Sequence, residues 1–209
     1  MTRLRARSPE EREERRELIL DAAEELITDQ GFETVSMNSV AARSGLAKGT
    51  LYLYFQTREE VFLALHARHR ELWMADMLAG LAEGQKLVPL VAGLAREHPV
   101  FLMLNARLGP VIEQNLPREA LIAEKRASSA DLAALITALG VRYDIDEEAA
   151  RRLVLAIMTA VVGASSVSSW RPPEGEVPAD VGQLYEMSRF EVLFAATAEF
   201  ILAGAGISE

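Results

Sequence analysis

The chain contains no cysteine among its 209 residues. Without thiols, neither a disulfide framework nor a thiolate metal site can form. Its longest apolar run, from Leu153 to Ala164, is too short to span a bilayer. No apolar stretch follows Arg3, Arg5 and Arg7, so the N-terminus predicts no secretory signal. We therefore expect a cytoplasmic protein with no membrane partner.

The sequence also lacks the signs of strands and of catalysis. No period-two apolar alternation persists, and neither a repeat nor a glycine-rich phosphate loop is present. The serine-rich stretch 164–169 contains no G-x-S-x-G turn. His66 and His69 have the i,i+3 spacing that can share a metal, but packing at a helical interface is the ordinary explanation. We predict no enzyme, no cofactor and no metal site.

The net charge of −9 argues against indiscriminate binding to nucleic acid. Any contact with DNA has to come from a local basic surface, with the acidic bulk of the protein held away from the phosphates.

Helical signals cover the chain. Ser8, Pro9 and Glu11 predict the start of a first helix that ends at Gly31. Ser36 predicts the cap of a second helix, and Thr57 caps a fourth after a short third one. The predicted helices cover residues 9–30, 37–43, 47–53, 57–79, 86–105, 107–114, 118–139, 147–169 and 181–203, with a surface loop at 171–179. We predict an all-α protein of about nine helices.

Residues 31–60 carry the strongest functional signal. Ser44 and Gly45 predict a tight turn between two short helices. Leu51 and Phe55 are spaced to pack inward. The outward positions are Lys48, Gly49, Thr50, Tyr52 and Tyr54. Such a helix suits the major groove of DNA, although spacing alone leaves open a plain helical hairpin within a larger bundle.

The sequence over roughly residues 15–65 resembles the N-terminal domain of TetR-family transcriptional regulators. In register are A-x-x-L-I…G-F, S-x-x-x-V-A-x-x-S-G-L, K-G-T-L-Y-x-Y-F and R-E-E-V-F. Arg58 stands where lysine is usual, and Ala47 departs from the family pattern at a position where a capping serine is common. Asn38 and its neighbour Met37 have no base that we can assign.

The resemblance implies roles for individual residues at the DNA. Ser36, Lys48, Tyr52 and Arg58 would contact phosphates, Gly49 and Thr50 would face bases, and Tyr54 would line the groove wall. Arg43 is as well explained by a solvated charge. Arg3, Arg5 and Arg7 could form an arm that reaches the minor groove, with plain solvation as the alternative.

The resemblance also implies a helix-turn-helix domain at 1–56 and a helical ligand-binding and dimerisation domain at 57–209. The last two helices would pair in a homodimer. A pocket for a small, largely apolar effector is expected from Trp73, Met77, Phe101, Met103, Asn105 and Arg107. The protein would be a ligand-responsive regulator, most simply a repressor released from a palindromic double-stranded DNA operator.

A helical small-molecule-binding protein with no DNA role is the alternative function. It accounts for the C-terminal helices but leaves the K-G-T-L-Y sequence at 48–52 unexplained.

Overall fold

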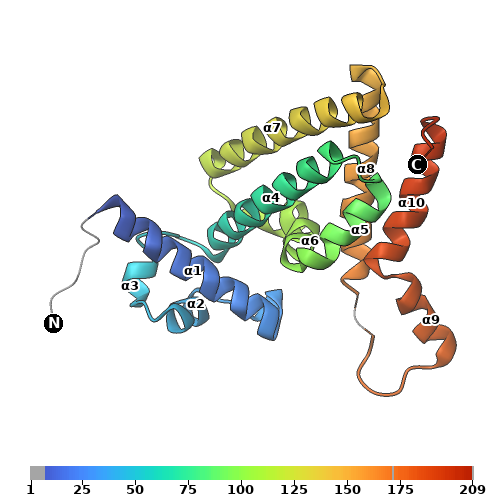
Figure 1. Ribbon diagram of the computed structural model, residues 1–209. Helices are drawn as coiled ribbons and strands as arrows, with labels where there is room; N and C mark the ends of the chain where they lie inside the picture. The colour runs from blue at the N-terminus through green and yellow to red at the C-terminus, as the bar shows by residue number, and fades with distance from the viewer. Residues whose placement is uncertain (1–7, 171, 209) are drawn as a thin grey trace.

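The computed structural model describes residues 8–170 and 172–208. The predictions for Arg3, Arg5 and Arg7 lie outside these residues. Within them the chain is helical throughout and forms no strand, which confirms the all-α prediction (Figure 1). The α-helices are α1 (Pro9–Gln30), α2 (Met37–Ser44), α3 (Lys48–Leu51), α4 (Arg58–Ala82), α5 (Leu87–Glu97), α6 (Pro99–Arg107), α7 (Arg118–Tyr143), α8 (Glu147–Ser168), α9 (Ala179–Met187) and α10 (Phe190–Gly204).

The predicted helix starts form as their caps require. The Ser8 hydroxyl accepts a hydrogen bond from the Glu11 amide at 3.2 Å, and the Thr57 hydroxyl accepts one from the Glu60 amide at 3.2 Å. Each bond satisfies an amide that has no partner inside its own helix. Helix α1 ends at Gly31, whose φ of 84° is a backbone conformation that favours glycine.

Two apolar cores organise the chain. The first core joins α1, α2 and α3 to the start of α4, and Val100, Leu104 and Ile112 complete it from the α6 region. The second core joins the rest of α4 to α5, α7, α8 and α10. Helix α4 therefore enters both cores, and it runs from the N-terminal helices into the larger helical body (Figure 1).

Three predicted helices differ from the structure. The helix expected over 86–105 breaks at His98 and Pro99, because proline lacks an amide hydrogen and restricts the residue before it. The segment 107–114 forms a π-helical turn, Leu108–Ile112, followed by a 3-10 turn, Glu113–Asn115.

The helix expected over 181–203 breaks at Ser188 and Arg189, giving α9 and α10. No proline or glycine marks this break. Ser188 is buried and its hydroxyl donates to the Leu184 carbonyl at 2.7 Å, while Arg189 adopts an extended conformation.

Helix α8 is longer and more apolar than its central run suggested. Over an 18-residue window of this helix the mean hydropathy is 1.5, which is enough by length and composition for a membrane span. The sequence-based prediction of no membrane span rested only on the shorter apolar run from Leu153 to Ala164, which cannot cross a bilayer. In this fold 39% of that window is buried, and α8 packs against α7 and α10. An apolar core helix passes the same test.

Candidate DNA-binding surface and internal cavity

Three local features shape α2 and the turn that leads from it into α3. Ser36 and Ser39 form a capping box, in which the Ser36 hydroxyl accepts from the Ser39 amide at 3.2 Å and the Ser36 amide donates to Ser39 Oγ at 2.9 Å. Gly45 ends α2 in the left-handed conformation, with φ of 68°. Ala47 then begins α3 without a side-chain cap.

Helix α3 is fixed to the core through one face and presents the other to solvent. Leu51 and Phe55 are buried in the first core. Lys48 and Gly49 are exposed, while Thr50 and Tyr52 are half-buried. The Lys48 Nζ lies 5.9 Å from the centroid of the Tyr52 ring, so an amine and a phenol are presented side by side.

Three other residues expected at the DNA are held by the protein itself. Tyr54 is half-buried and packs against the first core. Arg43 Nη1 donates to Glu25 Oε2 at 3.0 Å and to Asp29 Oδ2 at 3.1 Å, both on α1. This pairing favours the alternative in which Arg43 is a surface charge with protein partners, rather than a side chain free to contact a phosphate.

Arg58 begins α4 beside the helix-turn-helix unit. Its Nη1 donates to the Val35 carbonyl at 3.3 Å and its Nε to Glu59 Oε1 at 2.9 Å. These bonds fix the guanidinium near the start of α2, where Ser36 also lies.

Helix α1 and helix α4 are joined by a cluster of ion pairs around Arg68. Its guanidinium contacts Glu17 at 3.0 Å, Asp21 at 2.7 Å and Glu24 at 2.5 Å. His69 of α4 also lies 3.2 Å from Glu24. A displacement of this part of α4 therefore has to move α1 or break these contacts.

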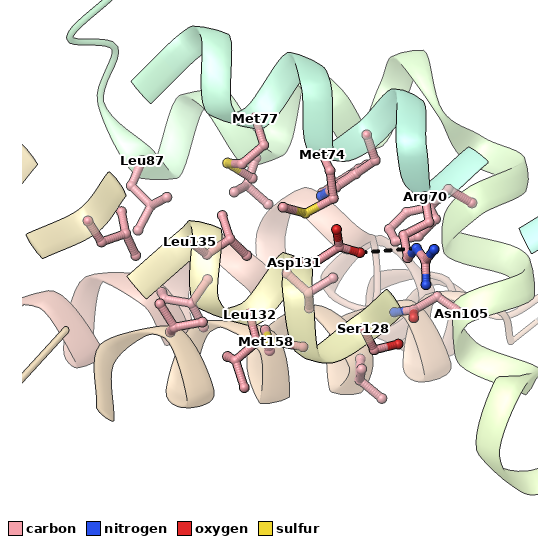
Figure 2. A pocket seen from close by; sticks show the side chains of 18 of the residues that line it. Arg70, Met74, Met77, Leu87, Asn105, Ser128, Asp131, Leu132, Leu135 and Met158 are labelled. Carbon is pink, nitrogen blue, oxygen red and sulfur yellow. Dashed lines mark ion pairs between the residues drawn. The ribbon is translucent and has the colours of Figure 1, made fainter. Parts of the chain in front are cut away.

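A cavity of about 120 Å³ lies between α4, α5, α6, α7 and α8 (Figure 2). Most of its wall is apolar. The expected residues Trp73, Met77, Phe101 and Asn105 line it, together with residues that the sequence analysis did not single out for it, including Arg70, Ser128, Asp131, Leu135 and Met158.

One end of the cavity is polar. Arg70 Nη1 donates to Glu124 Oε1 at 2.8 Å, and Ser128 Oγ donates to the same oxygen at 3.3 Å. Asp131 Oδ2 lies 3.1 Å from Arg70 Nε, and Figure 2 shows the two side chains pointing toward each other. This distance is that of an ion pair, but the Arg70 N–H does not point at the carboxylate as a hydrogen bond requires. Neither Arg70 Nε nor Asp131 Oδ2 has a hydrogen-bond partner within the described residues.

His66 lies beside this polar end. Its side chain is 3% exposed, its ring stacks on Phe101, and its Nδ1 lies 3.7 Å from Glu124 Oε1. Burial, with the nearby Arg70 charge, lowers the pKa of His66 from 6.5 to about 4. The imidazole is therefore neutral at neutral pH.

Met103 and Arg107 do not line the cavity. Met103 packs against the first core. The Arg107 guanidinium lies 5.0 Å from the Phe32 ring centroid and 3.5 Å from Glu33. Both residues thus face the helix-turn-helix side of α6. They were predicted for the cavity because helical spacing alone does not fix which face of this segment turns toward it.

The two histidines considered for a metal do not belong to the group of possible ligands that the described residues bring together. That group is Asp76, Glu97 and His98, whose ligand atoms lie within 4.8 Å of one another near the surface. His98 Nε2 lies 2.9 Å from Asp76 Oδ2, so this pair is already engaged.

An apolar face remains uncovered on α8, α9 and α10. Leu153, Ile157, Phe190 and Phe194 are buried in the core of the single chain, so this part of the expected dimer face is internal. Other large apolar side chains on these helices stay exposed, namely Leu155, Met158, Val162, Val181, Leu184, Met187, Val192 and Phe200, of which Met158 and Val162 also line the cavity. Between α8 and α10 a groove is lined by Leu155, Thr159, Gly163, Leu193, Thr197 and Ile201.

Two family models match the chain. The model described as "Bacterial regulatory proteins, tetR family" matches residues 19–65, and the model "Tetracyclin repressor-like, C-terminal domain" matches residues 67–208. The boundary between the two matches falls inside α4.

Curated relatives resemble parts of the chain. The transcriptional repressor KstR of Mycobacterium tuberculosis is 32% identical over 126 residues, which is 57% of this chain and 53% of the relative. The transcriptional activator FasR of Mycolicibacterium smegmatis is 40% identical over 58 residues, 28% of this chain and 26% of the relative. The matched segments thus span about half of KstR and about a quarter of FasR.

Solved structures share the fold over nearly the whole chain. FadR of Bacillus subtilis, solved in complex with stearoyl-CoA, superposes with a TM-score of 0.57 at 18% identity, covering 90% of this chain and 98% of that one. The repressor AlkX of Dietzia superposes with a TM-score of 0.54 at 20% identity, covering 90% and 96%.

Proposed function

This chain belongs to the TetR family of bacterial regulatory proteins, and on that premise we propose that it is a transcriptional repressor released from its operator by a small, largely apolar effector. The observation that carries the proposal is the position of α4. This helix lines the cavity through Trp73 and Met77 and holds α1 through Arg68. The proposal includes no catalytic step, and it places the protein in the cytoplasm.

For the DNA contact, we propose that α3 enters the major groove. Lys48 and Tyr52 lie side by side on its solvent-facing side and would contact phosphates, and Gly49 allows close approach of the backbone. Ser36 and Arg58 lie on either side of Val35 and would hold flanking phosphates. Thr50 would meet a base edge.

One such helix reads only a few base pairs, so two copies have to act together. The uncovered apolar face on α8 and α10 supplies the surface for pairing two chains. Phe200 is 83% exposed, which is unusual for a phenylalanine on a folded chain that has no partner there. We take residues 1–56 as the DNA-binding domain and 57–209 as the domain for effector binding and dimerisation.

Effector binding would shift the balance between two arrangements of the dimer. A molecule in the cavity presses on α4, and Arg68 transmits the displacement of α4 to α1. The two α3 helices must stay about 34 Å apart to meet successive major grooves. A change of a few ångströms in that spacing breaks the fit of the second half-site.

Selection from a random duplex library tests the DNA-binding half of the proposal. Purified protein should enrich a palindrome, with binding that weakens steeply as salt rises. If no duplex is enriched, either with or without a cell extract that could supply an effector, the helical binding protein without a DNA role becomes the correct interpretation.

A further inference from the structure

The polar end of the cavity carries more negative than positive charge. Arg70 supplies one cation, and Glu124 and Asp131 supply two carboxylates. His66 adds no charge because its imidazole is neutral at neutral pH. The remaining cation nearby, Lys125, is engaged by Glu113 at 2.5 Å.

Arg70 interacts differently with the two carboxylates, since it donates a hydrogen bond to Glu124 and none to Asp131 Oδ2. Glu124 is 4% exposed and accepts well-formed hydrogen bonds from Arg70 and Ser128. Asp131 is 31% exposed and lies at ion-pair distance from Arg70 Nε, but its Oδ2 atom is buried and accepts no hydrogen bond from the described residues. An unsatisfied buried carboxylate oxygen is costly unless a donor reaches it.

The rest of the cavity selects for a hydrocarbon chain. Trp73, Met77, Leu135 and Leu139 continue the wall away from the polar end. On α4 the lining extends from Arg70 to Leu81, which at the rise of an α-helix is about 16 Å. The cavity therefore has a mostly apolar wall, and Arg70 and Asp131 lie together at one end of it (Figure 2).

From this arrangement we infer that the effector is an amphipathic molecule with a cationic, hydrogen-bond-donating head, such as an alkylammonium, which Asp131 accepts while the cavity encloses the chain. The inference rests on the proposed function for its biological meaning, but the binding preference stands without it. An anionic head would add a third negative charge and would have to displace a carboxylate from Arg70. A neutral head would leave the charge at this end unbalanced.

Burial raises the pKa of Asp131, as does the nearby charge of Glu71, whereas Arg70 lowers it. A cationic head beside the carboxyl would lower this pKa again and stabilise the ionised form. A cationic ligand therefore favours the ionised form of Asp131, and the ionised form of Asp131 in turn favours a cationic ligand.

Three ligands of equal chain length separate the possibilities. We would measure direct binding of n-octylammonium, n-octanol and n-octanoate at pH 7.5 through the fluorescence of Trp73, which lines the cavity. Trp170 is 56% exposed, so a Trp170→Phe background leaves Trp73 as the reporter. Octylammonium should bind about tenfold more tightly than octanol, as expected for a charged hydrogen bond, and octanoate should bind most weakly.

Substitutions assign the preference to one residue. Asp131→Asn and Asp131→Ser should each lower octylammonium affinity about tenfold and change octanol affinity by no more than about twofold. Unchanged octanol binding also shows that the variants fold. Asp76→Asn is the matched control, since Asp76 lies on α4 outside the cavity lining. Equal or tighter binding of octanoate or octanol, or full retention of the preference in both Asp131 variants, overturns the inference.

The affinity of the protein for a selected duplex is measured separately in the presence of each of these ligands. If octylammonium shows the predicted preference but leaves the affinity for a selected duplex unchanged, the inference stands and the proposed function fails. If octanoate or octanol releases the duplex and octylammonium does not, the proposed function stands and the inference fails.

Discussion

Arg68 Nη1 of α4 donates to Asp21 Oδ1 of α1 at 2.7 Å, across 47 positions of sequence. The same guanidinium also contacts Glu17 and Glu24, so one side chain ties the helix that lines the cavity to the helix that supports the DNA-binding unit. Under the proposed function, the coupling between ligand and DNA would pass through a contact that can be removed by one substitution.

Arg68→Ala should uncouple the two sites. The side chain is only 23% exposed, yet its partners remain partly solvated, so we expect a loss of about 1 kcal/mol in the free energy of unfolding. Ligand affinity should be retained, while the ligand-induced loss of DNA affinity should shrink. Urea unfolding and DNA-binding titrations with and without ligand measure the two effects. Arg151→Ala, which removes a helical i,i+4 pair elsewhere, is the control. Full ligand response in Arg68→Ala would show that α1 and α4 communicate by another route.

Lys48→Ala and Tyr52→Ala should weaken binding to all duplexes alike, because phosphate contacts carry little sequence information. Lys48→Ala should also reduce the slope of log affinity against log salt by about one. Lys86→Ala removes an exposed lysine at the start of α5 and should change neither quantity. Unaltered affinity in the Lys48 and Tyr52 variants would remove these side chains from the interface.

Gly45 and Gly49 should respond oppositely to alanine. Gly45 has φ of 68°, so Gly45→Ala should lower the free energy of unfolding by about 1 kcal/mol. Gly49 lies in α3 with open space around it, so Gly49→Ala should maintain or raise stability, since alanine favours helix. Its added methyl group should still weaken DNA binding, because it stands between the backbone and the duplex. Thermal unfolding and duplex titration separate the effects, and wild-type affinity for Gly49→Ala would exclude close approach at that position.

His66 should make stability depend on pH. Its folded pKa of about 4 lies below the unfolded value of 6.5, so the unfolded state binds the proton first. Its contribution is present above pH 6.5 and is lost as the pH falls toward 4, a change of about 3 kcal/mol at most. The difference in unfolding free energy between pH 7 and pH 4 should therefore be smaller in His66→Leu than in the wild type. His98→Gln serves as the control, and equal pH dependence in wild type and His66→Leu would contradict a buried neutral imidazole.

Phe200→Asp should convert the proposed dimer to monomer. Phe200 is 83% exposed on α10, and a charge in the centre of an apolar interface is costly to desolvate. Val141→Asp is a matched control, because Val141 is 82% exposed on α7, outside the α8–α10 face. Light scattering at micromolar concentration reports the mass. A wild-type monomer would refute the two-fold assembly.

The N-terminal helices could be predicted closely because their signals are local. Ser8, Ser36 and Thr57 cap helices through side chains three residues from their partners, and Gly45 marks a turn by its backbone alone. The family resemblance then placed the same residues in a known arrangement. Such features need no knowledge of what packs against them.

The cavity was harder to predict because it depends on which helical faces meet. Trp73, Met77, Phe101 and Asn105 line it as expected, whereas Met103 and Arg107 turn toward the first core. Its polar end was not predicted because helical spacing does not show that Arg70 of α4 and Asp131 of α7 meet across the cavity.

A signal for that polar end was nevertheless present in the spacing. Arg70 continues the stripe of buried residues four positions after His66 and four before Met74. On α7, Asp131 stands four positions before Leu135, which lines the same cavity. When a positive residue on one helix and a negative residue on another each lie on the apolar face of their helix, an ion pair between the two helices is indicated.

Reciprocal linkage is the most direct test of coupling between the cavity and the DNA. One would measure the affinity for the selected palindrome with and without a compound that saturates the Trp73 signal, and the affinity for that compound with and without the palindrome. We predict that each ligand weakens the other by the same factor, about 5-fold to 150-fold, as thermodynamic coupling requires. A compound that fills the cavity while the duplex affinity stays unchanged would contradict the proposed regulation.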